Sequence, residues 1–170
     1  MQDADLFMEL AAIAGVFVGF GALIAVRSGG TSDVFEVAWM RGVVSIGLMA
    51  VLAALVPVVI SRYGLSDHEV WALSSVLFLV GWIGTFLINN LSPEARAEEA
   101  DPVRRSVKIV RFAVWLPSMA FLLLAPIAIA LNLAPVAEEA LYFTLVALTL
   151  AMCAMALLML VFTGRRPASA

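Results

Sequence analysis

Five long apolar stretches, separated by short polar segments, dominate the hydrophobic pattern of the chain. Each is long enough to cross the hydrocarbon core of a bilayer, which is about 30 Å thick and takes about 20 helical residues. Such runs predict transmembrane helices rather than the helices of a water-soluble core. The expected spans are residues 6–26, 37–60, 70–91, 109–131 and 140–162. The pattern therefore predicts an all-α fold, a multipass membrane helical bundle that forms a single transmembrane domain over residues 1–170.

The polar segments between the spans carry signals for helix starts and stops. Ser66 followed by Glu69 is a capping box, in which the two side chains satisfy free backbone N–H groups at a helix start. Asn132 to Pro135 interrupt the chain before the two glutamates that open the last span. Residues 92–108 form the longest polar stretch, and we expect them to be a linker on the cytoplasmic side.

The basic residues are distributed unevenly between the two sides of the predicted bundle. With the N-terminus outside, nine of the ten Lys and Arg residues fall on the cytoplasmic side, and Arg62 alone falls outside. For the five predicted transmembrane helices, the positive-inside rule therefore predicts an orientation with the N-terminus out and the C-terminus in. The expected location is the cell membrane, specifically a bacterial inner membrane.

The composition agrees with a membrane protein and excludes several other classes. Hydrophobic residues make up 64% of the chain and charged residues only 14%, whereas soluble domains carry about a quarter charged residues. The net charge of −3 leaves no basic stripe for nucleic acid. The lone Cys153 forms neither an internal disulfide nor a metal site. We expect no metal and no cofactor, since the sequence holds no cluster of metal ligands and no pair of intramembrane histidines.

A shift of 70 residues aligns the second and third spans with the fourth and fifth. Arg41 then meets Arg111, and Glu69 meets Glu139. A duplicated two-helix hairpin would produce these matches, as in transporters built from parallel repeats. Chance matches between apolar sequences are the alternative, and the sequence does not separate the two.

Four polar residues define a candidate layer near the cytoplasmic side. Arg41 and Arg111 each lie one to two turns inside a span, where a guanidinium is costly unless it reaches the interface, pairs or faces water. Asn89 and Asn90 end the third span on the same side. The arginines either extend to lipid headgroups, line a positively charged vestibule or anionic-lipid pocket, or form an interhelical ion pair.

The first span carries small residues at nearly every fourth position: Ala11, Gly15, Gly19 and Ala22. Such a face lets another helix approach closely, and Gly15 with Gly19 is a GxxxG motif. We expect these residues to serve helix packing, within one subunit or between subunits, rather than to line a pore.

Several other polar or helix-breaking residues invite a functional interpretation. Glu9, near the outer end of the first span, is either an interfacial acid or part of an outer mouth that concentrates cations. His68 has no ligand partner at a suitable spacing, so we expect it to be a solvated loop residue. Pro57, Pro117 and Pro126 lie inside spans, where each removes one backbone hydrogen bond.

No motif in the sequence identifies a reaction, so we expect no enzymatic activity. Three functions stay open. The first is a homo-oligomeric ion channel or small-solute transporter, and the second is an accessory or scaffold subunit of a larger membrane complex. The third is a protein that binds membrane lipids, with anionic phospholipid at the cytoplasmic side.

Overall fold

The computed structural model describes residues 4–27, 34–91 and 102–163, and the side-chain surroundings of residues 4–24, 40–91 and 115–158. Within these residues the chain forms long α-helices and no strand. The helices are α1 (Ala4–Arg27), α2 (Val34–Ile60), α3 (Asp67–Asn90), α5 (Pro102–Ala130) and α6 (Glu138–Thr163), with the short 3-10 turn η1 (Ser61–Tyr63) after α2.

Every predicted span coincides with one of these helices. Most boundaries lie within a turn of the predicted ones, but α5 begins at Pro102 rather than at residue 109. The second half of the expected 92–108 linker is therefore largely helical, and residues 92–101 lie outside the described residues. Proline suits the first position of a helix because its missing N–H would have no helical partner there. The all-α prediction is confirmed.

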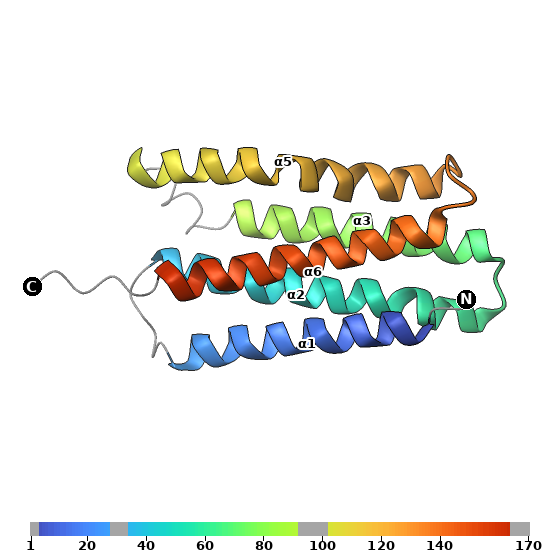
Figure 1. The fold of residues 1–170 in the computed structure, drawn as a ribbon, viewed down its shortest axis with the longest axis horizontal. Helices are drawn as coiled ribbons and strands as arrows, with labels where there is room; N and C mark the ends of the chain where they lie inside the picture. The colour runs from blue at the N-terminus through green and yellow to red at the C-terminus, as the bar shows by residue number, and fades with distance from the viewer. Residues whose placement is uncertain (1–3, 28–33, 92–101, 164–170) are drawn as a thin grey trace, which may run out of the picture.

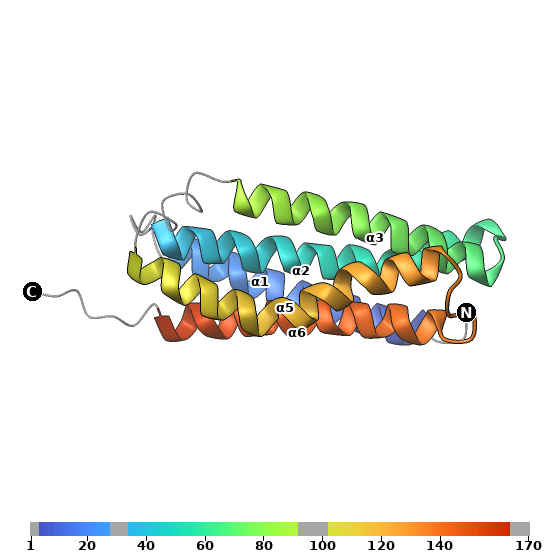
Figure 2. The same ribbon diagram turned by 90° about the horizontal axis from the view of Figure 1, so that it is seen from above.

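The helices run up and down along one long axis, side by side (Figure 1). Helix α2 packs against α1, α3 and α6, and α5 closes a ring by packing against α3 and α6. Helix α1 lies outside this ring, against α2 and α6, as the two views in Figures 1 and 2 show. The start of α1, the α2–α3 connection and the α5–α6 connection share one end of the bundle, here called the η1 end.

Within the described residues, four helices are long and apolar enough to cross a membrane: α1, α2, α3 and α6. In α5, residues 115–130 form a shorter apolar helix within the described side chains. Large apolar side chains also face outward on all five helices, for example Leu23, Val80 and Leu124. Water would penalise such a surface, whereas lipid accepts it. These apolar helices and outward-facing apolar side chains are consistent with an integral membrane protein.

The predicted helix ends at the η1 end are confirmed. Ser66 caps α3, with its backbone N–H donating to Glu69 Oε2 at 2.8 Å and its hydroxyl accepting from the Glu69 N–H. Asn132 adopts a left-handed conformation (φ 53°) just after α5. Its N–H donates to the Ile129 carbonyl and the next N–H to that of Ala128, a Schellman motif that ends the helix.

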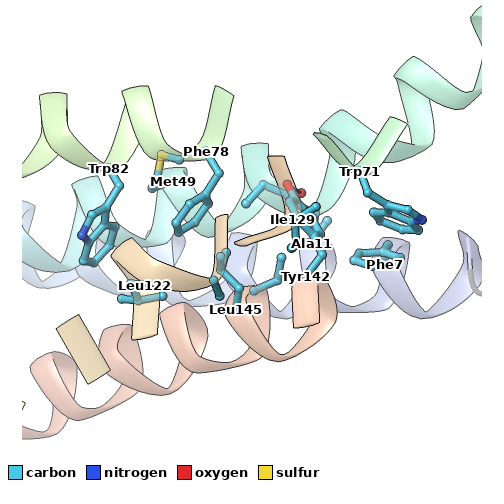
Figure 3. Packing of buried hydrophobic residues seen from close by; sticks show 14 of the residues in the cluster. Phe7, Ala11, Met49, Trp71, Phe78, Trp82, Leu122, Ile129, Tyr142 and Leu145 are labelled. Carbon is cyan, nitrogen blue, oxygen red and sulfur yellow. Dashed lines mark hydrogen bonds between the residues drawn. The ribbon is translucent and has the colours of Figure 1, made fainter. Parts of the chain in front are cut away.

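The core of the bundle is apolar and contains two groups of aromatic side chains (Figure 3). Near the η1 end, Phe7 and Tyr142 pack against Trp71, with ring centroids 5.8 Å and 5.5 Å from it. Farther along α3, Phe78 and Trp82 stack at 6.0 Å beside Leu122. Three helices thus meet at Trp71, which fixes the position of α1 on the bundle.

Candidate functional site

The described interior of the bundle is filled by apolar side chains. Its buried polar or charged residues are four: Ser74, Ser75, Thr149 and Glu138. Thr149 donates to the Leu145 carbonyl of its own helix, which is the usual arrangement for a hydroxyl in an apolar helix. Among the described side chains no polar path therefore runs along the bundle axis.

The two asparagines of the predicted polar layer make different contacts. Asn89 Nδ2 of α3 donates to Ser45 Oγ of α2 at 3.0 Å, and Ser45 Oγ donates to the Arg41 carbonyl at 2.6 Å. Asn90 is exposed and donates to the Phe86 carbonyl of its own helix. The structure thus links Asn89 to the Arg41 turn of α2 through Ser45.

Arg41 is half-buried. The side chain of Arg111 lies outside the described side chains, so its membership of this layer stays a prediction. Ser45 is the residue that sequence analysis missed here. The signal that could have identified it is its position one turn after Arg41, on a helix antiparallel to the one that carries Asn89.

The small residues of α1 divide between two faces. Ala11 is buried in the core, whereas Gly15, Gly19 and Ala22 are exposed. A Cβ atom added at Gly15 or Gly19 would meet no atom within 4 Å. Within one subunit these glycines are therefore not needed for the approach of another helix.

The close approaches inside the subunit occur at other glycines. A Cβ added at Gly47 of α2 would lie 2.6 Å from Val18 Cγ2 of α1 and 3.4 Å from Cys153 Sγ of α6. One added at Gly21 of α1 would lie 3.1 Å from Val43 Cγ1. The covered seam between α1, α2 and α6 thus depends on Gly21 and Gly47.

Glu9 lies on the outward side of α1. It is exposed, and two helical residues correspond to a rotation of about 200°, so it projects away from its buried neighbours Phe7 and Ala11. Glu9 does not take part in the packing of the bundle. It is free to face lipid headgroups or another subunit.

His68 lies in the first turn of α3 rather than in a loop, and its partly exposed side chain contacts α6. Its Nδ1 lies 2.7 Å from Oε1 of Glu138, which is buried at the start of α6. The 70-residue alignment that pairs Glu69 with Glu139 also pairs His68 with Glu138, and this was the available signal. Within the described residues, no group of three His, Cys, Asp or Glu residues forms a metal site.

Comparisons with protein-family models, with curated proteins and with solved structures find no match to this chain.

Proposed function

We propose that the chain is a non-catalytic, homo-oligomeric membrane protein that conducts an ion or a small solute between its subunits. The observation that carries the proposal is the bare face of α1 formed by Gly15, Gly19 and Ala22. Small residues on an exposed face let a second helix approach closely in lipid, where van der Waals contact and not water exclusion drives association.

The conduit lies between subunits because the described interior of one subunit is filled. Aromatic rings occupy the bundle near the η1 end and again around Phe78 and Trp82. A ring of identical subunits would instead enclose a path along its symmetry axis. Glu9, which projects outward from α1, would stand at one mouth of that path, and Arg41 and Arg111 near the other.

The proposed topology has five transmembrane helices in the cell membrane, specifically a bacterial inner membrane, with the N-terminus out and the C-terminus in. The charge distribution supports it, because nine of ten basic residues then lie on the cytoplasmic side. A fluorescent reporter fused to the C-terminus should fluoresce, and an alkaline phosphatase fusion there should be inactive. The reverse pattern would reject this orientation.

We also propose that α2–α3 and α5–α6 are tandem copies of one hairpin. The ring order α2, α3, α5, α6 supports this, because a twofold axis through its centre would exchange the hairpins. Equivalent residues meet only near such an axis. His68 and Glu138, which the 70-residue shift makes equivalent, lie 2.7 Å apart.

Oligomerisation through α1 is tested by native mass spectrometry of the protein released from lipid nanodiscs. The wild-type chain should appear as one closed oligomer. Gly19→Leu, which places a bulky side chain on the bare face, should shift it to the monomer. Ile13→Leu is the matched control and should leave the oligomer intact, because Ile13 is exposed and lies about 160° around α1 from Gly15. A wild-type monomer in every bilayer composition would reject the proposal.

Conduction is tested in liposomes with ion-selective dyes. Wild-type protein and Ile13→Leu should carry flux, Gly19→Leu should abolish it, and Glu9→Gln should lower cation flux at low salt. An intact oligomer without flux of any common ion would leave a second function, an accessory or scaffold subunit. The filled interior of the bundle favours that alternative.

Membrane lipids are the remaining proposed partner, with anionic phospholipid at the Arg41 end of the bundle. The half-buried Arg41, placed beside the Ser45–Asn89 contact, supports this interaction. Native mass spectrometry should retain phospholipid on the wild-type chain and less on Arg41→Ala. No nucleic acid is proposed as a partner.

A further inference from the structure

Pro57 leaves one backbone carbonyl of α2 without its helical partner. Proline has no N–H, so the carbonyl of Ala53, four residues earlier, receives no hydrogen bond from position 57. Both residues are buried, Ala53 with 2% of its surface exposed. Water therefore does not reach this carbonyl, and leaving it unpaired would be costly.

The hydroxyl of Tyr142 supplies the missing donor from a different helix. Tyr142 Oη of α6 donates to the Ala53 carbonyl at 2.9 Å, across 89 residues of sequence. The tyrosine ring is fully buried and packs against Trp71 and Phe7 (Figure 3). These rings restrict the orientation of the side chain, so the hydroxyl is held at the carbonyl.

We infer that the hydrogen bond from Tyr142 restrains a proline hinge in α2. With the hydrogen bond made, the turn after Pro57 continues the axis of α2 into η1. With the bond broken, the last turn of α2 bends at Pro57 and carries η1 and the start of α3 with it. Proline kinks are common hinge points because the helix there lacks one hydrogen bond.

The other buried proline lacks this arrangement. Pro126 of α5 removes the partner of the Leu122 carbonyl in the same way. Within the described residues, no side chain donates a hydrogen bond to that carbonyl. Of the two buried prolines that the structure describes, Pro57 therefore has a side-chain donor at the carbonyl four residues earlier and Pro126 does not.

The hydrogen bond itself is tested by NMR of the protein in nanodiscs. The chain contains two Ala-Ala pairs, Ala11–Ala12 and Ala53–Ala54, so labelling with 13C-carbonyl and 15N alanine yields two carbonyl signals. In Tyr142→Phe the Ala53 carbonyl signal should move upfield, because its hydrogen bond is lost, while the ring is retained. An unchanged Ala53 signal would overturn the inference.

The hinge is tested by hydrogen exchange of the α2 segment after Pro57, measured by mass spectrometry. Tyr142→Phe should raise exchange of residues 58–60 about tenfold, as expected when a buried acceptor loses its donor. Thr149→Val is the matched control. It removes another fully buried hydroxyl of α6, but its acceptor, the Leu145 carbonyl, keeps the backbone N–H of the helix.

A double substitution separates the effect of the Tyr142 hydrogen bond from that of general packing around the tyrosine. Pro57→Ala restores an N–H that donates to the Ala53 carbonyl, so Tyr142→Phe should then raise exchange by less than about a third of its effect in wild type. An equal effect of Tyr142→Phe in both backgrounds would overturn the inference, since the hydroxyl would then act independently of the proline.

Discussion

The two sides of α1 differ in how their small residues are used. On the covered side, Ala14 is fully buried and Gly21 faces Val43 of α2 at close range. On the outward side, Gly15 and Gly19 have open space where a side chain would be. The literal GxxxG motif therefore lies on the face that its own subunit leaves uncovered.

This difference shows that a small-residue motif indicates close approach of another helix but does not identify that helix. A glycine in a helix costs about 1 kcal/mol relative to alanine, so its presence calls for a compensating contact. Gly47 has that contact within the subunit, at Val18 and Cys153. For Gly15 and Gly19 we assign it to a neighbouring subunit, as proposed above.

Ala14→Leu should produce the largest loss of stability on the covered side of α1. Ala14 has no exposed surface, so a leucine must displace the atoms packed around it, at the upper end of the roughly 1–3 kcal/mol typical of overpacking. Thermal unfolding in detergent measures the loss. Ala12→Leu, at an exposed position of the same helix, should leave the midpoint unchanged; an equal loss would contradict the assignment of faces.

Gly47→Ala should cost less than Ala14→Leu but still about 1–2 kcal/mol. The new methyl would lie 2.6 Å from Val18 Cγ2, and valine is stiff at its first side-chain torsion. Unfolding midpoints compare the variant with the double substitution Gly47→Ala, Val18→Ala. The second substitution removes the clashing methyl groups and should recover part of the loss; no recovery would mean that the clash is elsewhere.

Gly81→Ala should cost under about 1 kcal/mol, although its added methyl also meets an atom closer than 3 Å. The neighbour here is the end of the Met49 side chain, at 2.8 Å, and methionine has flexible torsions that let it move aside. The same unfolding assay ranks it against Gly47→Ala. The reverse order would show that the flexibility of the neighbour does not decide the cost.

Gly15→Ala should have the smallest effect on the fold, a gain within about 1 kcal/mol. No neighbouring atom opposes the methyl, and alanine loses less backbone entropy on forming a helix. The measurement belongs in a detergent that keeps the chain monomeric, so that subunit contacts do not contribute. A clear loss of stability would place a hidden contact on this face.

The elements of the fold were predictable from local signals. Long apolar runs predicted the five helices, Ser66 with Glu69 predicted the start of α3, and Asn132 marked the end of α5. Each signal acts over a few residues, through backbone hydrogen bonds that the local sequence satisfies or removes. The early start of α5 at Pro102 was not predicted because Arg104, Arg105 and Lys108 interrupt the apolar run, and the expected span rested on apolarity alone.

The contacts of the candidate site were less predictable. The sequence placed Arg41 and Asn89 near the same end, but not Ser45 as their link, and it left His68 without its partner Glu138. The Tyr142 hydroxyl and the Ala53 carbonyl are likewise far apart in sequence. Such pairs depend on the rotation of each helix about its own axis, which local patterns do not encode.

By itself the sequence determined that the chain forms apolar helices of membrane-spanning length and where most of them begin and end. Only the tertiary structure decided which side of each helix is covered, and therefore which glycines touch a neighbour and which stand bare. The physical reason is that lipid is as apolar as the bundle interior, so outward and inward positions carry similar residues. Helix rotation is then selected by steric fit and a few hydrogen bonds between helices.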